Sequence, residues 1–237
     1  DRTGDAEPLL LTTGEAHAGL AEAVLDLVPQ VGAAQGGLHH VVQLGLAHPP
    51  GVEAHPRGDV LVVRRLSASA VSAPYAANRI YFRSAYEGGE YFQGPTPPDF
   101  SGSNRQPPYT DYTLEETVYY ISPYSISPDE SPRIPALYRT RLAPGPAMVP
   151  ELIASGVENM QVRFGRFDPA LGAQYHDPAA VADWDTISSV QVTLLMRGTA
   201  VEPGYQNTTT YEIADQKLEV SDGYRRTVLS TVVQLRN

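Results

Sequence analysis

The clearest pattern in the chain is an alternation of apolar and polar residues that follows a short stretch with helical signals. Met160, Val162 and Phe164 alternate with polar neighbours, which predicts a half-buried strand. Just before them, Pro150 suits the first turn of a helix and Gly156 suits its end. The pattern therefore predicts a helix of about two turns that leads directly into a strand.

Further apolar or alternating runs predict strands along most of the chain. These runs lie at 59–67, 79–86, 115–125, 134–143, 188–198, 208–213 and 224–237. A short helix is expected over 179–184. Because the runs follow one another with little helical pattern between them, we expect a mostly antiparallel sheet of about seven strands.

The beginning of the chain has a helical rather than an alternating pattern of apolar residues. Leu20, Val24 and Leu27 fall at helical spacing, and the stretch that follows is short and irregular. We therefore expect an α+β protein with two parts. A helical or irregular N-terminal segment over 1–56 would pack on the antiparallel sheet of a β-rich globular domain over 57–237, which would carry long loops.

Composition narrows the range of partners. The chain has 27 acidic and 17 basic residues and a net charge of −10, so counterion release from nucleic acid would not favour binding. Nucleic acid remains an option only if Arg64–Arg65 and Arg225–Arg226 form a local basic patch. The absence of cysteine excludes disulfides and thiolate chemistry. No run is long enough to cross a bilayer, and the start of the sequence is not a signal peptide.

Aromatic residues supply the candidate interaction surface. The chain contains 14 Tyr, 5 Phe and 1 Trp, a balance typical of half-exposed positions where a hydroxyl stays in contact with water. Many of them lie in or beside a stretch rich in Gly, Pro and Ser (87–112), which we interpret as a long exposed loop. The residues expected to contact partners are Tyr91, Phe92, Phe100, Tyr109, Tyr112 and Trp184.

Motifs that carry catalysis are missing from the sequence. It contains no G-x-S-x-G, no phosphate-binding loop and no dinucleotide-binding G-x-G-x-x-G after a strand. We therefore predict no catalytic residue, no cofactor and no metal ligand. His176 and Asp177 lie near Asp168, but the spaced oxygen ligands of a calcium loop are absent, so a calcium site there is only a lesser alternative.

Several stretches together resemble a known family. They are "GDVLVVRRLS", "YYISPYS" with "PALYRTRL", "ELIASGVENMQVRFGRFD", "VADWDTISSVQVTLLMRG" and "YRRTVLSTVVQLRN". In this order they resemble the PilW-type minor pilins of type IV pili. The resemblance covers about residues 57–237, and residues 1–50 match poorly.

This resemblance implies a pilin-like subunit, with a long N-terminal helix packed on an antiparallel sheet and no catalytic residues. Family members are single-pass inner-membrane proteins before assembly, with their bulk in the periplasm, and then part of the pilus at the cell surface. The implied partners are other minor pilins, the major pilin and the inner-membrane assembly platform. The implied role is to initiate assembly and to occupy the pilus, including its tip, for motility, adhesion or DNA uptake.

The prepilin leader and the apolar start of the helix do not occur in this sequence, so we expect a soluble, truncated ectodomain that would meet the membrane only through the missing helix. Three other functions stay open. A J-type pseudopilin of type II secretion has the same layout. A carbohydrate-binding or adhesin module would use Trp184 and the tyrosines as stacking platforms. A secreted hydrolase is disfavoured by the missing motifs.

Overall fold

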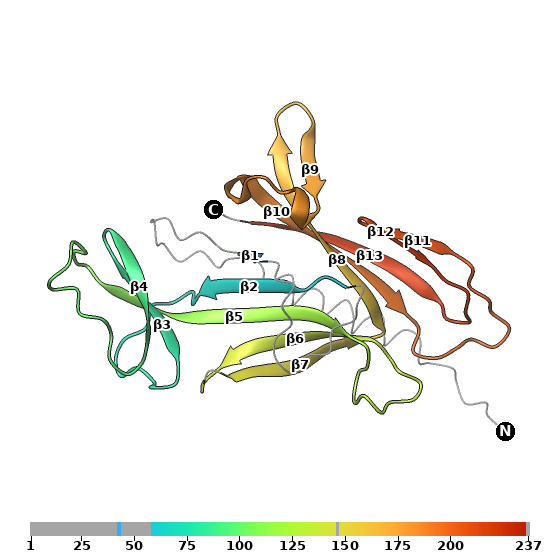
Figure 1. Ribbon diagram of the computed structural model, residues 1–237, viewed down its shortest axis with the longest axis horizontal. Coiled ribbons are helices and arrows are strands. Elements are labelled where there is room, and N and C mark those ends of the chain that lie inside the picture. Colours follow the sequence, from blue (N-terminus) through green and yellow to red (C-terminus); the bar gives the residue numbers. More distant parts are fainter. Residues whose placement is uncertain (1–41, 44–57, 146, 236–237) are drawn as a thin grey trace, which may run out of the picture.

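The described part of the chain is built almost entirely of β-strands. The computed structural model describes residues 42–43, 58–145 and 147–235 (Figure 1). Over these ranges it has thirteen strands, two 3₁₀ helices and no α-helix. The expectation of an α+β fold is therefore wrong for the described residues, where no helix packs on a sheet. Most of the expected N-terminal segment lies outside them, apart from Val42–Gln43, which form strand β1.

The first sheet has seven strands arranged around the long strand β5. Its members are β1 (Val42–Gln43), β2 (Leu61–Leu66), β3 (Ile80–Ala85), β4 (Gly88–Gln93), β5 (Thr110–Ser122), β6 (Ala136–Ala143) and β7 (Ala147–Ser155). β5 pairs with β2 along one edge. Along the other edge its first residues pair with β3 and its last residues with β6. All pairings are antiparallel, as the sequence predicts.

The second sheet lies across the first and has four antiparallel strands (Figure 1). Its strands, in spatial order, are β13 (Arg226–Gln234), β10 (Ile187–Arg197), β8 (Val157–Asp168) and β9 (Gly172–His176). A separate hairpin is formed by β11 (Thr210–Ile213) and β12 (Gln216–Glu219). The 3₁₀ helices η1 (Pro178–Ala180) and η2 (Trp184–Thr186) stand where a short helix is predicted over 179–184.

The two sheets share one hydrophobic core. Alternate residues of each strand point inward, so apolar residues two positions apart meet those of the facing sheet. The main buried members are Leu61, Val63, Tyr119, Ile121, Leu137, Val157, Met160, Val162, Phe164, Ile187, Val190, Val192, Leu194 and Val233. The predicted alternation of Met160, Val162 and Phe164 belongs to this core. Each fully buried side chain of this kind contributes about 1.5–3 kcal/mol relative to an exposed one.

The helix predicted between Pro150 and Gly156 is a strand instead. Residues 150–155 belong to β7, which pairs with β6 from Ala136 opposite Ser155 to Ala143 opposite Ala147. β7 lies at the edge of the first sheet. A proline is tolerated on an edge strand because its missing N–H can face away from the neighbouring strand. Pairing with β6 therefore overrides the local helical signal of Pro150 and Gly156.

Gly156 carries the chain from the first sheet to the second in a single residue. Its φ of +81° lies in the left-handed region that favours glycine. Its N–H donates to the carbonyl of Pro135, and its own carbonyl accepts from the N–H of Arg197, each at 2.6 Å. A second link is made by Asp59, which accepts from the N–H of Val162 and donates its N–H to Met160, each at 2.8 Å. The sheets are therefore joined by backbone bonds as well as by the core.

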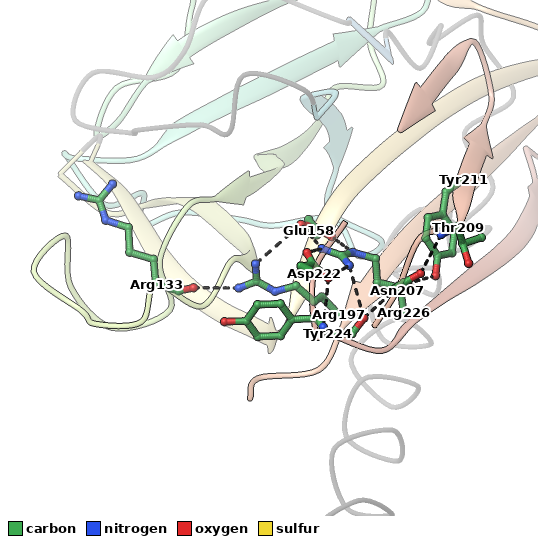
Figure 2. A network of polar contacts seen from close by, with 9 residues as sticks. All are labelled: Arg133, Glu158, Arg197, Asn207, Thr209, Tyr211, Asp222, Tyr224 and Arg226. Atoms are coloured by element: carbon green, nitrogen blue, oxygen red, sulfur yellow. Dashed lines mark hydrogen bonds and ion pairs between the residues drawn. The ribbon is translucent and has the colours of Figure 1, made fainter. Parts of the chain in front are cut away.

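A network around the buried Arg226 lies at the end of the second sheet where β10 ends and β13 begins (Figure 2). The Arg226 side chain is 2% exposed and donates to Glu158 at 2.6 Å and to both carboxylate oxygens of Asp222 at 2.7 Å. Arg197 stacks on the Tyr224 ring at 4.3 Å and donates to the Arg133 carbonyl at 2.9 Å. The network fixes the ends of the connection between β10 and β13, which carries the β11–β12 hairpin.

Candidate interaction surface

The most distinctive surface of the described chain is an aromatic lobe at one end of the first sheet. We define the aromatic lobe as residues 75–113, which comprise the β3–β4 hairpin, the connection 94–109 and the first residues of β5. The hairpin and connection extend beyond the rest of the first sheet (Figure 1). β3 holds the lobe on the sheet, because it pairs with β5 from Tyr81 opposite Thr113 to Ser84 opposite Thr110. The strand predicted over 79–86 supplies this element.

One face of the hairpin has an aromatic cluster of its own. Tyr81 and Phe92 are directly opposite each other on β3 and β4, and Tyr75 packs edge-on against both. The three ring centroids are separated by 5.2–5.4 Å. On the other face, Phe82 meets Tyr91 at 4.9 Å. Aromatic cross-strand pairs stabilise a hairpin, so this lobe does not depend on the shared core for its packing.

An ion pair ties the lobe to β5. Arg83 on β3 donates two hydrogen bonds of 2.8 Å to the buried carboxylate of Asp111, and its third nitrogen donates to the Pro98 carbonyl at 3.1 Å. Tyr75 also donates its hydroxyl to Asp111. The hydrogen bonds from Arg83 lower the pKa of Asp111, while burial raises the pKa of Tyr75. Arg83 and Asp111 therefore form an ionised pair at neutral pH, and its role is structural.

The connection 94–109 is anchored rather than free. Phe100 is 4% exposed and lies between Tyr109, 5.5 Å away, and the guanidinium of Arg105, 4.7 Å away. Arg105 also pairs with Glu90 at 2.6 Å. The carboxylate of Asp99 accepts from both the N–H and the hydroxyl of Ser101 at 2.9 Å. Phe100 is therefore the anchor of the connection and offers little surface to a partner.

The six residues predicted as contacts divide into three groups. Tyr91 and Tyr109 are exposed, at 57% and 39%. Phe92 and Tyr112 are half-buried within the aromatic lobe, and Phe100 is buried there. The structure brings these five together.

Trp184, the sixth, lies apart from the others. It follows β9 in the second sheet, where its ring packs edge-on against Phe164 at 4.9 Å. It is 44% exposed but contributes to the wall of the shared core, as an anchoring tryptophan does.

Sequence reasoning missed the most exposed aromatic residue of the aromatic lobe. Tyr86 is 81% exposed, at the turn between β3 and β4. The run 79–86 predicts a strand that includes Tyr86, but the following Glu87–Gly88 pair is a turn signal, and Gly88 has a φ of +114°. An aromatic residue directly before such a turn stands at the tip of a hairpin.

Other candidate sites show no arrangement for catalysis. A hollow of about 280 Å³ lies beside β5, where β3 begins and β6 ends, lined by Arg65, Arg79, Glu115 and Arg141 among others. Glu115 already pairs with Arg65 at 2.8 Å. Asp177 pairs with Arg163 and Asp168 accepts from the backbone of its own turn. Within the described ranges, no group of three His, Asp or Glu residues is placed to hold a metal.

No helix among the described residues is both long enough and apolar enough to cross a membrane. A family model described as type IV pilus-assembly protein W matches residues 118–237. Among solved structures, a type IV-like pilin from Thermus thermophilus is similar over 98% of this chain and 97% of its own, with 14% identity and a TM-score of 0.44. That likeness is too weak to carry a further argument. No curated protein matches the chain.

Proposed function

The chain belongs to the type IV pilus-assembly protein W family, and on this basis we propose that it is a minor pilin, a low-abundance structural subunit of a type IV pilus. The match carries the proposal because it begins at Val118 within β5 and continues to the end of the chain. It therefore spans every strand of the second sheet and, in the first sheet, the last residues of β5 together with β6 and β7. Strand β2, whose Leu61 and Val63 also line the shared core, precedes it.

The aromatic lobe and the two-sheet scaffold are suited to different roles within this subunit. The lobe lies wholly before the matched residues, has its own packing and presents Tyr86, Tyr91 and Tyr109 to solvent. Tyrosines supply large contact areas at low entropic cost and are enriched at protein interfaces. We propose that the lobe contacts neighbouring pilus subunits, and that the two-sheet scaffold holds it in place.

The resemblance to PilW-type minor pilins also suggests a finer role for this subunit. We propose that the full-length protein resides in the inner membrane before assembly. There it joins other minor pilins in a complex that starts pilus assembly, and it is then incorporated near the pilus tip.

The test is made with the full-length gene in its own bacterium. Deleting the gene should reduce the number of pili per cell, and the unaltered gene should restore it. The double variant Tyr86→Ser and Tyr91→Ser should restore piliation poorly, because it removes exposed contact surface while leaving the cluster of Tyr75, Tyr81 and Phe92 intact. Electron microscopy of whole cells gives the count.

A matched control tests whether the effect belongs to the aromatic lobe. Phe167 and Leu171 are also exposed, at 67% and 71%, but lie on the β8–β9 hairpin. Their replacement by serine should restore piliation fully. Normal pili in the deletion strain would contradict the pilin role, whereas normal pili in the tyrosine variant alone would contradict only the role of the lobe.

A further inference from the structure

Strand β13 is the edge of the second sheet and lacks the usual features that keep sheet edges apart. It is nine residues long, and from Thr227 to Gln234 it contains no charged residue, no proline and no glycine. Arg226, at its start, is already bound to Glu158 and Asp222. A long, uncharged edge strand is a template for pairing with another strand.

The other long edges of the described sheets are protected. β7, at the edge of the first sheet, contains Pro150 and Glu151. β4 begins with two glycines and contains Glu90, and β9 has only five residues. Glycine, proline, charge and short length each discourage pairing between sheet edges. Of the four edge strands β4, β7, β9 and β13, β13 is thus the one best suited to accept another strand.

The backbone of β13 shows which residues would make the bonds. Leu235 donates its N–H to the Ser188 carbonyl of β10 at 2.8 Å, so odd-numbered residues of this strand point their backbone groups toward β10. Val228, Ser230 and Val232 therefore direct their N–H and C=O groups toward the open edge. The side chains of Val228 and Val232 are 42% and 41% exposed.

The residues of β13 whose backbone groups face the open edge are arranged symmetrically about Ser230. Val228 and Val232 stand symmetrically two residues to either side of Ser230. We propose that β13 pairs antiparallel with β13 of a second copy of this chain, with the two-fold axis at Ser230. Each Val228 then lies opposite Val232 of the second copy, and each such pair exchanges two backbone hydrogen bonds.

Charge favours a second copy at this edge over contact elsewhere. Each chain carries a net charge of −10, so two copies repel over most of their surfaces. The neutral stretch from Thr227 to Gln234 places no like charges opposite each other. Opposed valines at the centre also form a favourable cross-strand pair. This inference concerns self-association and holds whether or not the pilus role is correct.

The register can be tested by exchanging the paired valines. Sedimentation equilibrium of the 237-residue chain should show a monomer–dimer equilibrium. The double variant V228K/V232K should weaken the dimer by at least about tenfold, because it places like charges opposite each other twice. The variant V228K/V232E should recover most of the affinity, because the introduced lysine of each chain then faces the introduced glutamate of the other.

The matched control is V149K/L152K on edge strand β7, where the two side chains are 51% and 43% exposed. It should leave the dimer unchanged, and thermal unfolding should confirm that every variant is folded. A chain that is monomeric at all concentrations would overturn the proposal, even if β13 bound another pilus protein. Equal weakening by V228K/V232K and V228K/V232E would overturn the proposed register.

A cross-link provides a second readout that does not depend on affinity. The chain has no cysteine, so Ser230→Cys introduces one thiol. In a hydrogen-bonded antiparallel pair the Cα atoms are about 5.5 Å apart, within the range that a disulfide spans. Mild oxidation should give a covalent dimer with Ser230→Cys and far less with the exposed control Ser221→Cys. Equal yields from the two variants would contradict the proposal.

Discussion

At the scale of single residues, Arg226 combines a buried side chain with two acidic partners. Its buried guanidinium neutralises Glu158 and Asp222, which are 17% and 33% exposed. Arg226→Met should lower the free energy of unfolding by about 2–4 kcal/mol, because Asp222 loses its arginine in a partly desolvated site and Glu158 keeps only the longer contact with Arg197, at 3.8 Å. Urea denaturation followed by circular dichroism measures the change.

The neighbouring Arg225 is a natural control. It pairs with Glu202, but its side chain is 61% exposed. Arg225→Met should therefore lower the free energy of unfolding far less than Arg226→Met, as exposed ion pairs contribute little. Equal losses for the two variants would show that burial of the Arg226 network does not determine its contribution.

Acid should destabilise the protein through Asp111 and Asp222. Hydrogen bonds from Arg83 and Arg226 hold their pKa values below the ordinary 3.8. A carboxylate with a lowered folded-state pKa stabilises the fold above its unfolded pKa, and this contribution is lost as pH falls through the folded value. The free energy of unfolding should therefore decrease as pH drops below about 4.

Replacing Asp111 tests whether these aspartates cause the loss of stability in acid. Asp111→Asn should be less stable at neutral pH, because the amide cannot provide the same charged pair to Arg83, but its stability should change less steeply with acid. Denaturation curves at a series of pH values give the slopes. Identical slopes for the two proteins would assign the acid sensitivity to other groups.

At the scale of elements, the passage from β7 to β8 depends on Gly156. A Cβ atom there would lie 2.5 Å from the Arg197 carbonyl oxygen, in addition to the unfavourable φ of +81°. Gly156→Ala should destabilise the protein by more than about 2 kcal/mol, because the side chain brings both backbone strain and a steric clash. Chemical denaturation measures this.

Gly145→Ala separates the two effects. Gly145 also has a positive φ, +96°, but a Cβ atom there would meet nothing within 4 Å. It should therefore show only the conformational cost of about 1–2 kcal/mol. If the two alanine variants were equally stable, the close approach between the sheets would not be the cause.

Most strands were predictable from apolar alternation, and the failures have identifiable causes. β2, β3, β6 and β13 fall within predicted runs and β10 begins one residue before its run, because each carries its own inward-facing pattern. The sequence predicts a loop at β4 because Gly88 and Gly89 disfavour strands, yet pairing with β3 stabilises a strand there. It predicts a helix at β7 because the pairing with β6 is a long-range contact that a local pattern does not reveal.

The candidate surface was predictable to a similar degree. The Tyr- and Pro-rich composition of 87–112 indicated where aromatic residues gather, because half-exposed aromatics and turns share that composition. It could not show that Phe100 points inward or that Trp184 belongs to the second sheet, since both depend on neighbours distant in sequence. The partnership of Arg83 with Asp111 joins residues 28 positions apart and left no local signal.

At the scale of the whole molecule, the shared core predicts that the two sheets unfold together. Trp184, the single tryptophan, packs on Phe164 and so reports on the second sheet, whereas far-ultraviolet circular dichroism reports on all strands. The urea transitions seen by tryptophan fluorescence and by circular dichroism should coincide, as in a two-state domain. A fluorescence transition at distinctly lower urea would show that the second sheet unfolds separately.

The division of β5 has an evolutionary consequence. Its first residues carry the aromatic lobe and its last residues carry the shared core, so one strand joins two separately packed regions. Substitutions in the lobe therefore act on its own aromatic cluster and leave the two-sheet core in place. Descendants of such a protein can therefore accumulate substitutions in the lobe without first acquiring compensating mutations in the scaffold.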